Sequence, residues 1–102
     1  MLFLTKKKYI DAIMSGEKKV DLRRADGPWK KTKAGDRAVF VCGRDVVRKT
    51  VKEVIKGNLG EITSKVSYKE IVPWAKDGED FLRNIREIYP DEKEFIAYKL
   101  ED

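Results

Sequence analysis

The spacing of hydrophobic residues changes twice in the first quarter of the chain. The short apolar run Met1 to Leu4 is typical of a strand. Apolar residues then recur at helical spacing, at Tyr9, Ile10, Ile13 and Met14. We expect Thr5 to cap this helix and Gly16 to end it in a left-handed conformation. From Lys19 to Arg24 apolar and charged residues alternate, which predicts a strand with one buried face.

The middle of the chain has the pattern of strands separated by turns. After a basic loop, Arg37 to Cys42 forms one predicted strand, and the valine-rich segment Asp45 to Ile55 forms another that is long enough to contain a bulge. The stretch Gly57-Asn58-Leu59-Gly60 has the composition of a hairpin turn. We therefore predict a further strand over Glu61 to Val66.

The last third of the chain is mostly helical. Ser67-Tyr68-Lys69-Glu70 has the spacing of a capping box and predicts a short helix that ends at Pro73. A second helix begins at Asp77, and its apolar stripe consists of Phe81, Leu82, Ile85, Ile88 and Tyr89. Phe95 to Leu100 is a closing strand. Short strands without regular βαβ alternation predict an α+β fold, a small and mainly antiparallel barrel with packed helices.

Composition narrows the class of protein. The chain has 102 residues, which fits one domain over residues 1–102. Charged residues make up 40 %, against roughly 25 % in typical globular proteins. Abundant lysine and glutamate with few amides is typical of hyperthermophile proteins. The single cysteine, Cys42, has no disulfide partner, and no apolar stretch approaches the roughly 20 residues of a membrane span. We therefore expect a cytoplasmic protein without a membrane partner.

The absence of histidine excludes several kinds of active site. Neither a Ser-His-Asp nor a Cys-His nucleophile can form, and a zinc site of the usual kind lacks its ligands. No glycine-rich phosphate-binding loop is present. We therefore expect no cofactor and no metal, and any catalysis would depend on lysine, arginine, carboxylates or hydroxyls.

Positive charge is concentrated in the first half of the chain. Residues 1–58 hold 16 basic and 7 acidic residues, whereas residues 59–102 hold 7 basic and 11 acidic residues. Such a basic half is typical of proteins that bind a polyanion, and it is equally compatible with a solvated surface of mixed charge.

The stretch that joins the first helix to the next strand carries the main candidate site. It has the pattern Gly16-x-Lys18-x-x-Asp21-x-Arg23. Arg23 offers a planar fork for phosphate or a guanine edge, Lys18 supplies a point charge, and Asp21 can orient either cation or accept hydrogen bonds from an exocyclic amine. Strict alternation places Lys18 on the opposite face unless the chain bends near Lys19.

Two outcomes are open for this motif. If it is a ligand site, replacing Arg23 by alanine should weaken RNA binding and leave thermal stability near that of the wild type. In the alternative, the motif is a solvated strand face, and the Asp21–Arg23 pair contributes about 0–1 kcal/mol.

The basic loop Trp29-Lys30-Lys31-Thr32-Lys33 is a second candidate. An exposed Trp29 would stack on a base while Lys30, Lys31 and Lys33 neutralise phosphates. In the alternative, Trp29 closes one end of the core and the lysines point into water. Trp74 is expected to pack between a helix and the barrel.

The Gly16–Arg23 motif resembles the signature of ASCH domains, G-x-K-x-x-E-x-R, with Asp21 in place of the glutamate. The resemblance covers almost the whole chain, including the turn Lys33-Ala34-Gly35-Asp36 and the helix end Ile88-Tyr89-Pro90. It implies a PUA-like barrel with two to three packed helices and a cleft between barrel and helices that is lined by the motif. It also implies RNA or a modified nucleoside as the partner.

One compact ASCH branch is similar to this chain in length and in its Ile-Tyr-Pro ending, and it deacylates N4-acylated cytidine. This similarity implies an alternative function as a small amidohydrolase, in which Lys18 activates a threonine three residues later. Here Asp21 occupies the threonine position, so Asp21 would act as a general base on water. The glutamate ahead of the last helix has no direct equivalent, and Glu70 is the candidate for it. These departures favour binding over catalysis.

Overall fold

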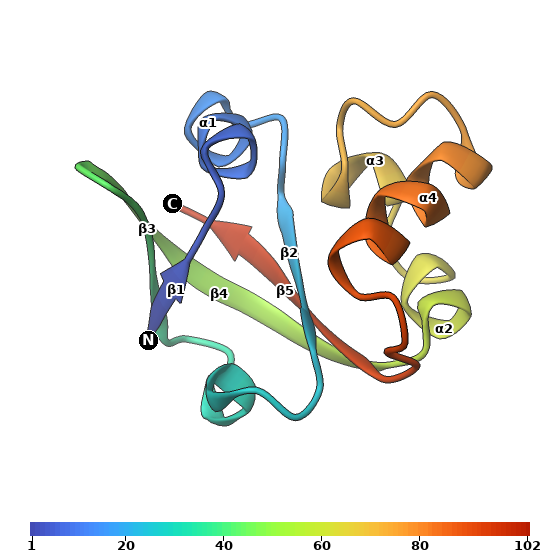
Figure 1. Cartoon of the computed structure of the whole chain (residues 1–102). Helices are drawn as coiled ribbons and strands as arrows, with labels where there is room; N and C mark the ends of the chain where they lie inside the picture. Colours follow the sequence, from blue (N-terminus) through green and yellow to red (C-terminus); the bar gives the residue numbers. More distant parts are fainter.

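The computed structural model describes every residue from Met1 to Asp102. Five strands form one sheet in the order β1-β3-β4-β5-β2 (Figure 1). Their bounds are β1 Leu2–Leu4, β2 Val20–Arg24, β3 Arg37–Cys42, β4 Asp45–Gly57 and β5 Phe95–Glu101. β1 pairs with β3 in parallel, and the other neighbours are antiparallel.

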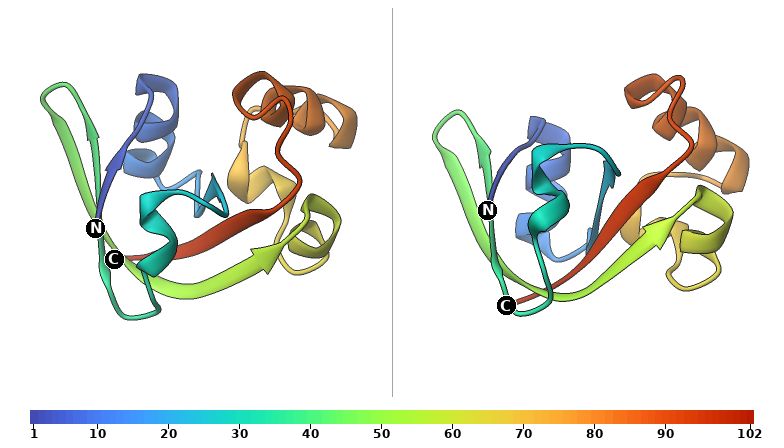
Figure 2. Two further views of the ribbon diagram at one scale, coloured as in Figure 1. Left: turned by 60° about the horizontal axis from the view of Figure 1, so that its bottom comes forward. Right: turned by 90° about the horizontal axis from the view of Figure 1, so that it is seen from below.

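The sheet curls strongly around its two long central strands, β4 and β5 (Figure 2). A register shift between Val51 and Glu53 marks the bulge expected in β4, and bulges increase strand twist. The two edge strands, β1 and β2, do not pair with each other, so the curl remains an open half-barrel. The predicted α+β and mainly antiparallel architecture is confirmed in this open form.

Four α-helices accompany the sheet, where two to three were expected. They are α1 Lys7–Ser15, α2 Leu59–Thr63, α3 Tyr68–Ile71 and α4 Gly78–Ile88, and the 3-10 helix η1 spans Pro28–Lys31. α1 lies on one side of β2, and α3 and α4 lie on the other (Figure 1). None of these helices combines the length and the apolar character that a membrane crossing requires.

The strand predicted over Glu61 to Val66 is wrong, because helix α2 extends over the first residues of this segment. The Asn58 side chain accepts a hydrogen bond from the Glu61 N–H at 2.8 Å, and the Glu61 carboxylate accepts one from the Asn58 N–H at 3.1 Å. This reciprocal capping starts a helix where the composition suggested a hairpin turn. Leu59 and Ile62 are buried by it.

The predicted cap of α1 is also wrong. Lys6 occupies the N-cap position and makes no side-chain cap, whereas the Thr5 hydroxyl donates to the carbonyl oxygen of Phe3. The expected end of the helix is confirmed, because Gly16 has a φ of 84°, which is the left-handed region.

Strand β2 lies between two hydrophobic clusters. The larger cluster packs α2, α3 and α4 against the sheet and includes Val20 and Leu22 of β2. The smaller one fills the curl beneath α1, where Phe3 and Phe40 stack with 5.1 Å between ring centroids. Cys42 is half-buried against this smaller cluster. The motif strand therefore runs along the boundary between the helical layer and the barrel.

Candidate functional site

A cavity of about 130 Å³ opens beside β2, between α1 and α4. Its polar lining consists of Thr5, Lys6, Tyr9, Lys18, Asp21, Arg23 and Tyr89. Its apolar lining consists of Leu4, Leu22, Ile71, Ile85 and Ile88. The three charged side chains of the motif thus meet at one hollow between barrel and helices.

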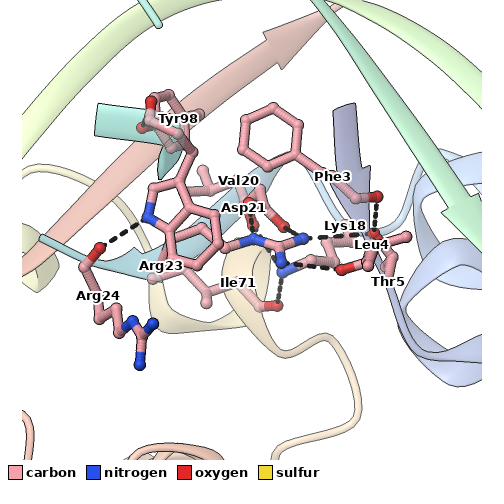
Figure 3. Close-up of polar contacts among 11 residues, drawn as sticks. Phe3, Leu4, Thr5, Lys18, Val20, Asp21, Arg23, Arg24, Ile71 and Tyr98 are labelled. Carbon is pink, nitrogen blue, oxygen red and sulfur yellow. Dashed lines mark hydrogen bonds and ion pairs between the residues drawn. The ribbon is translucent and has the colours of Figure 1, made fainter. Parts of the chain in front are cut away.

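Lys18 reaches this hollow because it precedes the first residue of β2. Its ammonium group donates to the carbonyl oxygen of Val20 at 2.7 Å and to that of Ile71 at 2.6 Å (Figure 3). These two bonds join the start of β2 to the end of α3. The side chain is only 4 % exposed. Burial lowers the pKa of Lys18 to about 8, against the opposing effect of the Asp21 carboxylate.

Asp21 and Arg23 form a two-point ion pair inside the protein. The Nε of Arg23 lies 2.8 Å from Oδ2 of Asp21, and its Nη2 lies 3.3 Å from Oδ1. Asp21 is only 3 % exposed. Burial opposes the charge on Arg23, but the Asp21 carboxylate outweighs it and raises the pKa of Arg23. The alternative of a solvated strand face is therefore wrong.

Arg23 also connects the two unpaired edges of the sheet. Its Nη1 donates to the carbonyl oxygen of Leu4 at 2.9 Å, and its Nη2 donates to Oγ1 of Thr5 at 3.3 Å (Figure 3). These contacts tie β2 to the end of β1. With the two bonds to Asp21, four of the five guanidinium N–H groups are used within the chain. One Nη1 hydrogen remains free.

The cavity holds several hydrogen-bond donors that have no partner within the chain. Lys18 has a third N–H, and the phenol groups of Tyr9 and Tyr89 make no hydrogen bond within the chain. Burial raises the pKa of Tyr9 to about 12 and also raises that of Tyr89, so both phenols keep their protons at neutral pH. Each oxygen of Asp21 already accepts from Arg23. The charges of Lys18, Asp21 and Arg23 sum to one positive charge, which suits a ligand rich in acceptors.

The residues of the basic loop do not line this cavity. The indole N–H of Trp29 donates to the carbonyl oxygen of Arg24 at 2.7 Å, and the hydroxyl of Tyr98 donates to the carbonyl oxygen of Trp29 at 2.7 Å. The ring packs against the smaller cluster and lies over Gly27, where an added Cβ would come within 2.0 Å of it. Trp29 therefore closes one end of the core, which was the alternative to stacking on a base.

Lys30, Lys31 and Lys33 do not reach the cavity either. They line a separate hollow on the surface, together with Lys56 of β4. They were predicted to contact phosphates because they surround Trp29 in a basic loop.

Two further candidates lie outside the cavity. Gly16 only ends α1, and its N–H donates to the carbonyl oxygen of Ile13. The Glu70 carboxylate accepts from the N–H of Ser67 at 3.3 Å as part of the α3 capping box. The combination of Lys18, Asp21 and Glu70 is therefore not assembled as a catalytic set. Trp74 packs edge-on against Tyr9, with 4.9 Å between ring centroids.

Several residues that line the cavity were not predicted from the sequence. Tyr9 and Tyr89 were assigned to the apolar stripes of their helices, yet their rings line the cavity. A tyrosine within such a stripe carries a polar end that needs water or a partner, and this was the available signal. Lys6 and Ile71 gave no signal, because only the packing of α1 and α3 against β2 brings them there.

No protein-family model matches this chain, and no curated protein matches it in sequence. Solved structures do match over nearly its whole length. Hypothetical protein PH0355 has a TM-score of 0.84 at 24 % identity, covering 98 % of this chain and 95 % of that one. Protein PF0455 from Pyrococcus furiosus has a TM-score of 0.74 at 21 % identity, covering 99 % and 96 %.

A protein named as ASCH is also among these structures. ASCH from Zymomonas mobilis has a TM-score of 0.72 at 17 % identity, over 99 % of this chain and 66 % of that one. The present chain thus spans about two thirds of the length of that protein. At these identities the similarity concerns the fold alone, and this chain shares its fold with ASCH from Zymomonas mobilis.

Proposed function

We propose that this protein binds RNA or a modified nucleoside and that the cavity beside β2 takes one base. The observation that carries the proposal is the meeting of Lys18, Asp21 and Arg23 at one hollow with apolar walls. Ligand sites in proteins commonly combine apolar walls with a few polar groups in this way. The ASCH resemblance of the motif supports the same ligand class.

The size of the cavity indicates how much of a nucleotide it can hold. At about 130 Å³ it is close to a cavity of about 150 Å³ that accommodates benzene, and it is below the roughly 300–1,000 Å³ of typical ligand pockets. A single planar ring therefore fits, while ribose and phosphate remain outside. The exposed residue Lys6 belongs to the lining and can contact a phosphate there.

The polar groups indicate which edge of a base is recognised. The free N–H of Lys18, the free Nη1 hydrogen of Arg23 and the phenols all donate. Cytosine presents acceptors at O2 and N3 on one edge. The apolar side chains of Leu22 and Ile88 supply contact for the ring. We therefore expect cytosine nucleosides to bind more tightly than uridine, whose N3 carries a hydrogen, and more tightly than the larger purine nucleosides.

Blocking the cavity tests the proposal. Ile88 is half-buried at the cavity, and Ile88→Trp would place an indole in the cavity. We expect at least a tenfold loss of affinity for cytidine, N4-acetylcytidine and a short single-stranded RNA, which corresponds to about 1.4 kcal/mol. Isothermal titration calorimetry measures these affinities.

The matched control is Leu82→Trp on the same helix. Leu82 is 46 % exposed and does not line the cavity, so this variant adds the same indole without filling the cavity. The control should keep wild-type affinity. Equal affinities of the two variants for all three ligands would contradict the proposal.

The amidohydrolase alternative has one feature in its favour. A lysine whose pKa is about 8 is close to the range useful for a general base. Against it, both oxygens of Asp21 accept from Arg23, and Glu70 lies elsewhere. Incubation with N4-acetylcytidine decides between the two functions. Release of cytidine beyond that of an Asp21→Asn variant would establish catalysis.

A further inference from the structure

We propose that the hollow beside η1 is a second binding site, which takes phosphate groups of an RNA backbone. Four lysines line it: Lys30, Lys31 and Lys33 come from η1 and the residues after it, and Lys56 comes from β4. The remaining lining residues are Thr32, Ala34 and Val54. This site lies apart from the cavity beside β2 and has no wall in common with it.

The charge of the hollow is not compensated within the protein. No acidic residue lines it, and none of its four lysines takes part in a salt bridge. Three other lysines, Lys7, Lys49 and Lys99, do pair with carboxylates. A concentration of unpaired ammonium groups in a concave surface attracts anions.

Thr32 provides a second and independent indication of a ligand. The residue is only 5 % exposed, and its N–H donates a hydrogen bond to the carbonyl oxygen of Trp29 at 2.9 Å. Its hydroxyl makes no hydrogen bond within the chain, yet no fully buried side-chain polar atom lacks a partner. The hydroxyl oxygen therefore keeps some contact with solvent, and the residue lines the hollow. A hydroxyl donor among ammonium groups is a common way to bind a phosphate.

The loop that carries these lysines is held in place. The Trp29 side chain and carbonyl are hydrogen-bonded to Arg24 and Tyr98, and the N–H of Lys33 donates to Asp36 at 2.8 Å. The loop backbone is thus fixed before a ligand arrives, which reduces the entropy lost on binding. The hollow is also concave, so a planar membrane surface would not reach the recessed hydroxyl of Thr32.

The two sites are connected through Trp29. The guanidinium of Arg23, which lines the cavity, lies 5.6 Å from the Trp29 ring centroid. Lys30 and Lys31 follow Trp29 directly in η1. The second site therefore adds backbone contacts to the base contacts proposed above, and RNA should bind more tightly than a nucleoside.

Salt dependence of RNA binding tests this inference. We would replace all four lysines of the hollow by glutamine and titrate a single-stranded RNA of mixed sequence between about 50 and 200 mM salt. Each phosphate contact contributes about 0.7 to the slope of log affinity against log salt for single strands. We expect the slope to become shallower by about 2 or more.

Thr32→Val provides a second measurement that does not alter charge. Valine keeps the shape of threonine and removes only the hydroxyl. We expect several-fold weaker RNA binding at fixed salt, with the slope unchanged. Wild-type affinity in this variant would show that the hydroxyl makes no contact and would overturn the assigned geometry.

A charge-matched control separates the hollow from general electrostatics. Exposed lysines of the acidic half of the chain are replaced by glutamine in this variant: Lys65, Lys69, Lys76 and Lys93. It should keep the wild-type slope. An equal change in both variants would overturn the proposal. The proposal would also be overturned if the four-lysine variant lost as much affinity for polyglutamate as for RNA, because the hollow would then bind acidic proteins.

The outcome is independent of the base site. The four-lysine variant should bind cytidine like the wild type, because cytidine has no phosphate. If Ile88→Trp leaves RNA binding intact while the four-lysine variant has a shallower salt slope, the proposal for the cavity fails and the proposal for the hollow is supported. If Ile88→Trp weakens RNA binding while the four-lysine variant keeps the wild-type slope, only the proposal for the hollow fails.

Discussion

Lys18 shows how a single residue can serve both structure and ligand binding. Its ammonium joins Val20 to Ile71, and Ile71 lies 53 positions after Lys18 in the chain. A neutral amine has two N–H groups, which is the number that these carbonyls need, and a charged ammonium has a third. The third N–H is the one available to a ligand. Deprotonation would therefore keep the two structural bonds and remove a donor from the cavity.

The lowered pKa of Lys18 predicts a specific pH dependence of stability. Burial lowers this pKa from 10.5 to about 8 in the folded protein. Between these values the unfolded chain binds more protons than the folded one, so the free energy of unfolding rises with pH. Measured against Lys18→Met in urea, the wild type should gain stability as pH rises through this interval. Below this pH interval the difference in the free energy of unfolding between the wild type and Lys18→Met should be constant.

Lys65→Met serves as the control for this titration. Lys65 is exposed, and the difference between this variant and the wild type should not change over the same pH interval. A wild-type advantage over Lys18→Met that is independent of pH would show that Lys18 keeps its proton throughout.

At the scale of elements, helix α2 shows how a cap can override composition. Gly57 and Gly60 suggested a turn, yet Asn58 and Glu61 have the spacing of a capping box and form one. Leu59 and Ile62 are three positions apart and are buried on one side of the helix. The local signal was therefore present, and the glycines on either side were given too much weight.

The cap of α2 can be tested by mutation. Asn58→Ala removes the side-chain acceptor for the Glu61 N–H and should lower the free energy of unfolding by about 1 kcal/mol. Asn58→Asp keeps an acceptor at this position and should stay close to the wild type. Urea denaturation measures both. If both variants lost the same free energy, the cap would not be the source of the stability.

At the scale of the whole molecule, the open half-barrel leaves the edge strands β1 and β2 without backbone hydrogen bonds to each other. Arg23 bridges them, since it bonds Asp21 on β2 and the carbonyl oxygen of Leu4 on β1. One side chain thus does part of what strand pairing does in a closed barrel. The expectation that Arg23 can be removed without loss of stability does not agree with this geometry.

Arg23→Ala should therefore destabilise the fold. It leaves the Asp21 carboxylate buried without a partner, and such a change typically costs about 3–5 kcal/mol. Arg23→Lys should restore little, because a point charge cannot bond both partners at once. Thermal and urea unfolding measure these effects.

Arg24→Ala is the matched control for this prediction. Arg24 is exposed, and its pair with Asp26 at 3.4 Å should contribute less than about 1 kcal/mol. Equal losses of stability in Arg23→Ala and Arg24→Ala would mean that the bridge between β1 and β2 contributes little.

Much of this architecture was predictable from local patterns. The helix that ends at Gly16, the bulged strand β4 and the late helix follow from periodicity and capping, which depend on neighbouring residues. The motif also singled out three charged residues that line one cavity. Trp29 was a candidate because it lies among lysines, and Glu70 because it precedes the last helix. Neither position along the chain determines which face of the protein the side chain joins.

The sequence by itself determined the chemistry that is available here, namely ammonium, carboxylate and guanidinium groups without histidine, and most of the elements that carry them. Only the tertiary structure decided that Lys18 bonds Ile71 and that Arg23 reaches Leu4. These contacts join residues far apart in the chain, and they depend on how α1, α3 and α4 pack around β2. Local periodicity holds no information about such distances, so the cavity and the hollow emerge only with the fold.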